Sequence, residues 1–457
     1  MLSSNSEGLQ RVQDLALRDK NLVFNNLLHH ADLELFRFAF KQLRKGASPG
    51  VDQKTWEEYK GGSSKVDREE FDSKLANLRE RVFNGSYMPL PVRRVYIPKP
   101  DGNKTRPLGI LAIEDKIVQM VVRLLIEPLF ESIFAGFSYG FRPNRGCHDA
   151  LDALYMCITR GKVSWILDAD IKAYFDSIPH DKLIECVKHR LSDPRIITLI
   201  AKWLKCGIME GSELYGSTTG TPQGGIISPL LANIYLHYML DTFTHEWRNT
   251  QSRGDVYIVR YADDFLVMFQ YKGDAQAYLA KLKWQFGRCG LELQTEKTRL
   301  IEFGRFAAQN RKDRGQGKPD TFDFLGFTHI CSKTLTGKFK LLRITIGKRL
   351  GRKLQEYKQN LKKMMHADIN DIIDSLNRSL QGYYNYFAIH DNLCSLNILR
   401  YQVIRALYKT LRRRSEKARS TVTWAWMNTI VAPFILQPHV THAYPSERFR
   451  PNVKAFG

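Results

Sequence analysis

The sequence predicts an α+β protein, with a mixed body of helices and strands followed by an all-helical C-terminal region. Up to about residue 330, short apolar segments bounded by turn residues predict strands, and they alternate with segments of helical periodicity. From about residue 345 only helical periodicity remains, with apolar side chains at Leu350, Leu354, Tyr357 and Leu361. The charge divides the chain in the same way, because residues 336–457 carry 22 Lys and Arg against seven Asp and Glu.

The first third of the chain predicts helices around one strand pair. Residues 1–45 have helical spacing, and the Gly/Pro-rich loop GASPGVD ends that unit. After a further helix, residues 92–110 predict two short strands around the turn PDGN. Helical periodicity returns over residues 114–134. The segment VSWILDADI (163–171) is almost entirely apolar, which is typical of a strand covered on both faces.

The middle of the chain predicts a second strand pair with two acids at its turn. GTPQGGIISPLLANIYLHYML (220–240) reads as a turn that enters a helix, and YIVRYADDFLVMF (257–269) reads as a hairpin. A helix around residues 276–290 and strands at TRLIEF and DFLGFTHI follow. We interpret residues 306–319 as an exposed basic loop.

The charge of the whole chain indicates a polyanionic partner. Its 457 residues include 69 Lys and Arg against 47 Asp and Glu, a net charge of +22. Such an excess favours nucleic acid, which is bound through phosphate contacts. Seven scattered cysteines without a CxxC pair indicate reduced thiols, and no apolar run approaches the roughly 18–20 residues of a membrane span. We therefore expect a cytoplasmic protein, in a bacterial cytoplasm or an organelle matrix, with no membrane partner.

Three aspartates are candidates for a metal site. A tight hairpin would place Asp263 and Asp264 at one edge of a sheet, where adjacent carboxylates repel each other. Asp170, at the end of a buried strand, supplies a third acid that can lie beside them. Mg²⁺ binds such carboxylates, and a pair of metal ions suits phosphoryl transfer. A solvated acidic turn is the alternative, and Asp168 and Asp176 are better explained as strand-end or helix-capping acids.

Several motifs occur in the order found in one protein family. YADD after an apolar strand resembles the signature of reverse transcriptases. SYGFRPNRGCHDAL (138–151), DADIKAYFDSI, GTPQGGIISPLLANIYL and DFLGF resemble the ordered blocks of the group II intron-encoded reverse transcriptase/maturases. The resemblance covers roughly residues 22 to 430. It implies the right-hand polymerase fold, with fingers, palm and thumb, an N-terminal helical extension and a C-terminal α-helical thumb/maturase domain.

The resemblance also implies domain boundaries. The N-terminal extension would span residues 1–50, and the fingers with the start of the palm residues 51–165. The palm, with part of the fingers, would span residues 166–335. The basic helical thumb/maturase domain would span residues 336–457.

The resemblance implies roles for individual residues in a nucleotide site. Asp170, Asp263 and Asp264 match the catalytic triad that holds two Mg²⁺ ions, with Mn²⁺ as a possible substitute. Phe175 matches the aromatic residue that selects dNTP over NTP by crowding the ribose 2′-hydroxyl, and a core aromatic is the alternative. The remaining substrate-binding matches are Lys99, Arg106, Gln223 and Lys297.

Other matches concern nucleic acid. Arg142 in GFRPNR matches a residue that holds the template or the fingers, and a structural arginine is the alternative. The basic helix that contains Lys348, Arg349, Arg352 and Lys353 is expected to follow an A-form duplex through its phosphates. The expected partners are an RNA template, the RNA/DNA duplex, dNTP and a group II intron RNA.

The resemblance thus implies an RNA-directed DNA polymerase that also assists intron splicing and retromobility. The alternatives are a domesticated relative serving phage defence, spacer acquisition or DNA repair, and a mainly RNA-binding splicing cofactor. RNA-dependent RNA synthesis is disfavoured by Phe175. Many family members also carry a C-terminal HNH endonuclease, and because this sequence lacks that pattern we do not expect it to cut a second strand.

Overall fold

The computed structural model describes residues 5–98, 105–211, 213–216, 219–221 and 224–449. Its strands are β1 (Val92–Pro98), β2 (Thr105–Ile110), β3 (Trp165–Ala169), β4 (Ile208–Glu210), β5 (Glu213–Tyr215), β6 (Val256–Tyr261), β7 (Asp264–Phe269), β8 (Arg299–Glu302), β9 (Phe322–Phe324), β10 (Phe327–Lys333) and β11 (Phe339–Thr345). Its longer helices are α1 (Asn5–Arg18), α2 (Leu33–Gln42), α4 (Lys65–Phe83), α5 (Ile113–Glu131), α6 (Cys147–Arg160), α8 (His180–Lys188), α9 (Pro194–Lys205), α10 (Ser228–Leu236), α11 (Thr242–Thr250), α12 (Lys272–Arg288), α14 (Gly347–Lys363), α15 (Ile369–Phe387) and α16 (Leu393–Leu411).

The shorter helices are α3 (Trp56–Lys60), α7 (Tyr174–Ser177), α13 (Ala307–Asp313), α17 (Glu416–Thr421), α18 (Trp424–Trp426) and α19 (Pro445–Arg448). Two 3₁₀ segments, η1 (Leu28–His30) and η4 (Ala432–Phe434), and two π-helical segments, η2 (His237–Asp241) and η3 (Met427–Val431), complete the elements of the described chain. Mixed helices and sheets confirm the α+β class.

A four-stranded antiparallel sheet, which we call the central sheet, has the strand order β6-β7-β3-β8. Leu167 on β3 is paired with Val267 on β7, and both belong to one hydrophobic core. Their neighbours Ile166 and Met268 are also paired and belong to a second core on the other face. The sheet is therefore buried on both faces, which confirms the prediction from VSWILDADI.

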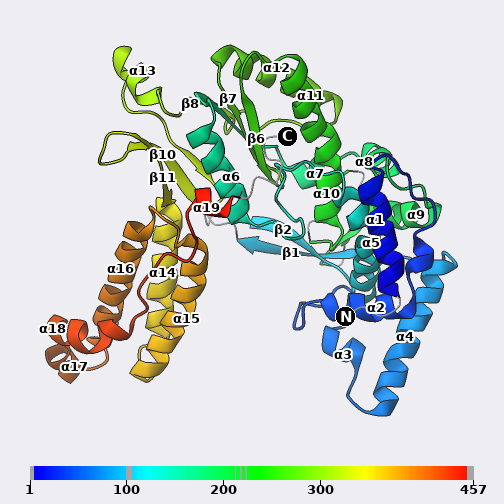
Figure 1. Ribbon diagram of the computed structural model, residues 1–457. Helices are drawn as coiled ribbons and strands as arrows, with labels where there is room; N and C mark the ends of the chain where they lie inside the picture. Colours follow the sequence, from blue (N-terminus) through cyan, green and yellow to red (C-terminus); the bar gives the residue numbers. More distant parts are fainter. Residues whose placement is uncertain (1–4, 99–104, 212, 217–218, 222–223, 450–457) are drawn as a thin grey trace.

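Helices cover both faces of the central sheet (Figure 1). On one face α12 contacts β3 and β7, and its buried Tyr278, Leu282 and Phe286 join the first core together with α5 and α10. On the other face α6 contacts β6, and its buried Leu151 and Leu154 join the second core.

A second sheet has the strand order β2-β1-β4-β5. β1 and β2 form the antiparallel hairpin that the sequence predicts over residues 92–110. β4 comes from residues far along the chain and is parallel to β1, with Val92 beside Ile208. The hairpin therefore connects to the segment that follows α9.

The N-terminal helices α1 and α2 pack on α5, and they confirm the helical prediction for residues 5–18 and 33–42. Asp193 fixes this unit to the rest of the body. Its side chain is fully buried, and it accepts hydrogen bonds from the main-chain amides of Leu27 (2.9 Å) and Leu28 (3.0 Å). It also caps α9 by accepting from the amide of Arg195.

A third sheet, β11-β10-β9, leads into the C-terminal helices. β10 and β11 pair from Phe327–Thr345 to Lys333–Phe339, so the predicted boundary between residues 335 and 336 falls in the turn of one hairpin. A structural break fits better after Thr345. The segment interpreted as a basic loop contains α13, so that interpretation was wrong for residues 307–313.

Helices α14, α15 and α16 lie side by side in a lobe at the lower left of Figure 1. Tyr357 and Leu361 of α14 are buried, as their helical spacing predicts. The chain then returns to the body, where Tyr444 shares a hydrogen bond of 2.9 Å with Tyr155 of α6. Among the described residues no helix is long and apolar enough to cross a membrane.

Candidate active site

The YADD sequence forms a two-residue turn between β6 and β7. Tyr261 and Asp264 are the last paired residues of the hairpin, so Ala262 and Asp263 make the turn. Ala262 has a φ of +57°, a left-handed backbone conformation that residues other than glycine adopt only at a cost in conformational energy. The turn therefore brings Asp263 and Asp264 to one edge of the central sheet, as the hairpin prediction requires.

Asp170 lies at the same edge. It directly follows β3, whose last pair with β7 joins Ala169 and Phe265, so the next position along each strand is Asp170 and Asp264. The carbonyl oxygen of Asp170 accepts a hydrogen bond of 2.8 Å from the amide of Gln294. Its carboxylate lies 2.5 Å from the ammonium of Lys297.

The carboxylates at this edge repel each other. Burial raises the pKa of Asp264 to about 6, and the charges of Asp263 and Asp170 act in the same direction, while Lys297 opposes them. Burial and then Asp170 raise the pKa of Asp263, which Arg106 lowers. The Asp264 side chain is nevertheless open to solvent, so water screens part of this repulsion. A cation at this edge would relieve the remainder.

A groove of about 510 Å³ opens beside these acids. Asp168, Asp170 and Asp264 line it together with Glu296, Lys297, Arg299, Asp323, Phe324 and Leu325. Arg299 pairs with Asp168 at 2.9 Å, which agrees with a structural role for that acid.

The donor chemistry of the edge fits a hard divalent cation, because the candidate ligands are carboxylate oxygens. The side chains as they stand do not converge on one point. In the part of the chain that the structure describes, no three His, Cys, Asp or Glu side chains are arranged so that they could hold a metal ion. The ion pair between Asp170 and Lys297 is one reason, since it directs that carboxylate to the ammonium.

The predicted nucleotide-binding residues are partly described. Lys99 and Gln223 lie outside the described residues. Arg106 is exposed on β2 and lies close enough to lower the pKa of Asp263 by its charge. Phe175 is half-buried on α7, and its carbonyl oxygen accepts a hydrogen bond of 2.7 Å from the amide of Thr221.

Arg142 is a structural residue and not an exposed nucleic-acid contact. Only 2% of its side chain is exposed. Its guanidinium donates to both carboxylate oxygens of Glu131 (2.8 and 2.6 Å) and to the carbonyl oxygens of Ala135 (2.6 Å) and Ser138 (2.7 Å). These contacts favour the structural alternative, and the predicted role in holding the template or the fingers stays a prediction.

The four basic residues predicted to contact a duplex lie on the first turns of α14. Lys348 and Arg349 are exposed, and Arg352 and Lys353 are half-buried. Lys353 pairs with Glu356 at 2.9 Å. The start of α14 lies beside the groove. Leu325 lines the groove, and a Cβ on its neighbour Gly326 would lie 3.0 Å from the guanidinium of Arg349.

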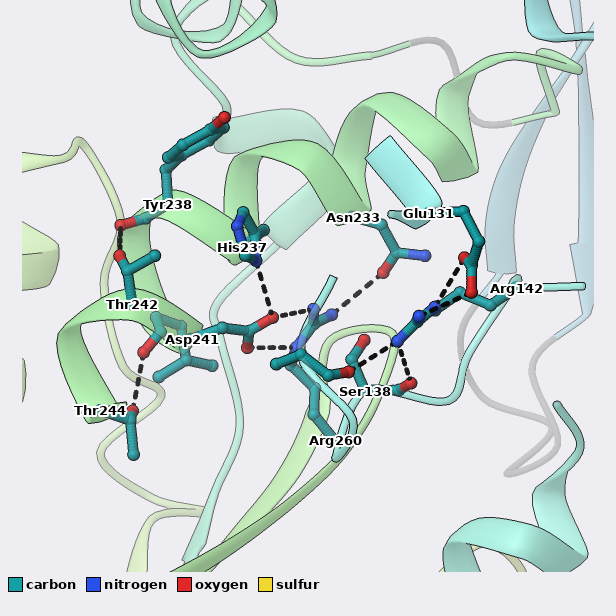
Figure 2. Close-up of polar contacts among 12 residues, drawn as sticks. Glu131, Ser138, Arg142, Asn233, His237, Tyr238, Asp241, Thr242, Thr244 and Arg260 are labelled. Carbon is teal, nitrogen blue, oxygen red and sulfur yellow. Dashed lines mark hydrogen bonds and ion pairs between the residues drawn. The ribbon is translucent and has the colours of Figure 1, made fainter. Parts of the chain in front are cut away.

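Two residues that were not predicted from the sequence, Arg260 and Gly140, contact or support the YADD turn. Arg260, inside the apolar strand β6, is fully buried and pairs with Asp241 (Figure 2). Gly140 lies against the turn itself, since a Cβ there would meet the amide nitrogen of Ala262 at 2.3 Å. A charged residue within an otherwise apolar strand segment was the available signal, because a buried charge requires a partner.

Comparison with known proteins identifies the family. A model described as reverse transcriptase (RNA-dependent DNA polymerase) matches residues 97–329, and reverse transcriptase domains generally use divalent metal ions. Protein YkfC of Escherichia coli (strain K12) is 36% identical over 332 residues, which cover 65% of this chain and 80% of that protein. Group II intron-encoded protein LtrA of Lactococcus lactis subsp. cremoris is 29% identical over 412 residues, covering 74% of this chain and 67% of LtrA. The chain belongs to the reverse transcriptase (RNA-dependent DNA polymerase) family and, within it, to the group II intron reverse transcriptase/maturase type.

Proposed function

We propose that Asp170, Asp263 and Asp264 hold two Mg²⁺ ions, or Mn²⁺ in their place, for the addition of dNTP to a primer. The position of all three acids at one edge of the central sheet, beside an open groove, is the observation that carries this proposal. The primer 3′-oxygen bonds to the α-phosphorus as the bond to pyrophosphate breaks, and the hydroxyl proton is released. Bound divalent ions supply activation of that hydroxyl and stabilisation of the leaving group.

The chain's own residues would orient the nucleotide. Lys297 and Arg106 are cations suited to a triphosphate, and Lys297 is paired with the Asp170 carboxylate in the groove. We assign Lys99 and Gln223 to the same pocket on their motifs alone. Phe175 would exclude the ribose 2′-hydroxyl, so Phe175→Val should raise incorporation of ribonucleotides relative to dNTP.

Primer extension on an RNA template tests the catalytic assignment. The variant D263A/D264A should lose extension by several orders of magnitude. It should unfold at the same or a higher temperature than the native protein, because it removes mutual repulsion. Asp320→Ala removes an exposed surface acid and serves as the control. Extension by D263A/D264A at the native rate would refute the assignment.

We also propose the domain roles implied by the motifs. The N-terminal helices through residue 50 form the extension, residues 51–165 the fingers with the start of the palm, and residues 166–335 the palm with part of the fingers. The basic C-terminal helices form the thumb, which holds an RNA/DNA duplex. The exposed positions of Lys348 and Arg349 beside the groove support this.

Salt dependence of binding tests the duplex contact. K348A/R349A should weaken binding to an RNA/DNA duplex and make the slope of log K against log salt shallower by about 1.5, since each lost phosphate contact changes it by about 0.7–0.9. K281A/K283A removes the same charge from exposed positions on α12 and should leave the slope unchanged. Equal effects of the two variants would contradict a specific contact on α14.

Finally, we propose that the chain binds a group II intron RNA and assists its splicing and retromobility. The relative LtrA is named a group II intron-encoded protein, and the basic C-terminal helices offer a surface for RNA. Sequencing of RNA that co-purifies with the full chain would identify the partner. A splicing role should survive in D263A/D264A, because RNA binding does not require the catalytic acids.

A further inference from the structure

Arg260 is the only residue of the hairpin's YIVRY strand segment that carries a charge, and none of its surface is exposed. Its guanidinium donates to both carboxylate oxygens of Asp241, at 2.8 and 2.6 Å. The third guanidinium nitrogen, Nη1, donates to the side-chain oxygen of Asn233 and to the carbonyl oxygen of Ala262, each at 3.0 Å. The last of these acceptors belongs to the YADD turn.

The two side-chain partners of Arg260, Asn233 and Asp241, come from one continuous helical segment, α10 followed by η2 (Figure 2). Asp241 is the last residue of the π-helical turn η2, a widened turn that changes which side chains face the sheet. Its neighbour His237 lies 3.9 Å from the same carboxylate, and burial lowers the pKa of His237 to about 4. At neutral pH His237 is uncharged, so Arg260 is the cation that satisfies Asp241.

Asn233 also binds the backbone at Gly140, the second segment that lies against the YADD turn. Its side-chain amide donates to the carbonyl oxygen of Gly140 at 2.7 Å. The amide of Tyr139 donates a main-chain hydrogen bond of 2.8 Å to the carbonyl oxygen of Arg260, and Ser138 forms an isolated parallel bridge with Arg260, so this segment lies alongside the end of β6. The helix α10, which begins at Ser228, thus holds both segments that border the YADD turn.

We propose that Arg260 is a positioning residue for the polymerase reaction, because it holds the Ala262 carbonyl and so fixes the direction in which Asp263 and Asp264 project. This inference rests on the proposed metal-binding role of those two acids. Ala262 adopts a left-handed conformation, which persists only where the surroundings impose it. The hydrogen bond from Arg260 supplies that restraint on the carbonyl side of the turn. Asp241 and Asn233 in turn hold the guanidinium.

The alternative is that the Arg260–Asp241 pair contributes only to stability. A double substitution separates a positioning role from a purely stabilising one. In R260M/D241L both charges are removed together, so no buried charge is left without a partner and the fold should persist. The matched control is R343M/D152L, a second pair with side chains only 2% and 8% exposed that lies between β11 and α6, away from the YADD turn. Asp152 also pairs with Arg448, which keeps Asp149 as a partner in this variant. A purely structural role predicts the same behaviour for both variants.

Two measurements on the full chain distinguish a positioning role of Arg260 from a purely structural one. In primer extension on RNA, R260M/D241L should lower kcat at least tenfold with little change in KM for dNTP. In titrations without primer or dNTP, followed by the electron paramagnetic resonance of free Mn²⁺, the same variant should bind Mn²⁺ at least tenfold more weakly. R343M/D152L should match the native protein in both. If R260M/D241L does not fold, R260K replaces it in both measurements and should show the same losses, because the single nitrogen of lysine can pair with Asp241 but does not replace the separate guanidinium nitrogen that donates to Ala262.

Native kcat and native Mn²⁺ affinity in the Arg260 variant would overturn the positioning role. The variant D263A/D264A, measured in parallel, keeps this outcome distinct from failure of the metal site. If D263A/D264A loses Mn²⁺ binding while R260M/D241L retains it, only the inference about Arg260 fails. If D263A/D264A itself keeps Mn²⁺ binding and extension, the proposed metal site fails and the inference fails with it.

Discussion

Replacement of Gly140 by alanine should damage catalysis more than stability. The new Cβ would lie 2.3 Å from the amide nitrogen of Ala262, whereas ordinary contact begins at 3.4 Å. The SYGF segment and the YADD turn must therefore separate by about 1 Å. A displacement of this size at a catalytic group costs roughly 10²-fold in rate. The overpacking should cost about 1–3 kcal/mol of unfolding free energy, as is usual in well-packed interiors.

Single-turnover primer extension on an RNA template measures the rate, and urea unfolding measures the stability. Gly287→Ala is the matched control, because a Cβ at this position in α12 meets no atom within 4 Å. It should leave the rate unchanged and raise the unfolding free energy by about 0.5–1 kcal/mol through helix propensity. A rate for Gly140→Ala within twofold of the native rate would refute the argument that this glycine sets the position of the turn.

Three further predictions concern stability. Burial lowers the pKa of His329 to about 3, so the unfolded chain binds a proton below pH 6.5 that the folded chain does not. Stability is therefore lost as the pH falls, and His329→Phe should reduce the loss between pH 7.5 and 5 by about 2 kcal/mol in urea unfolding; an unchanged loss would contradict this. Tyr87→Phe removes the hydroxyl that donates to buried Asp115 and should cost about 1–3 kcal/mol at pH 7.5. The cost should be smaller at pH 5, because burial raises the pKa of Asp115 to about 6, and equal costs would argue against a charged acceptor. Asp193→Ala should increase hydrogen exchange at the amides of residues 27 and 28, and native protection there would exclude the proposed anchor.

Local patterns predicted the elements that build the site. The almost entirely apolar run 163–171 predicted a strand buried on both faces, and the two apolar runs in 257–269 predicted the hairpin that carries the paired acids at its turn end. Both are determined by neighbours in the sequence, so pattern and turn chemistry suffice. The helix expected over 114–134 corresponds to α5, with its end three residues earlier.

Long-range contacts could not be predicted in the same way. The role of Arg142 depends on a carboxylate 11 residues away, and that of Arg260 on partners 19 and 27 residues away. An arginine in the motif GFRPNR therefore looks like a ligand contact until its burial is known. Helix α13 was missed for another reason: its seven residues, AAQNRKD, have no apolar stripe to mark one face.

The two faces of the central sheet belong to different cores, and this restricts how the protein can diverge. Leu266 and Met268 on β7 belong to the core that continues through α6 into the C-terminal helices, whereas Phe265 and Val267 belong to the core of the N-terminal half. Loss of the C-terminal helices would leave that second core open beside the strand that carries Asp264. We therefore expect the C-terminal helices to tolerate substitutions mainly on their solvent-exposed faces, where most of their lysines and arginines lie. Changes of charge on that surface leave the second core intact, whereas changes in the interior beneath β7 disturb the strand that carries Asp264.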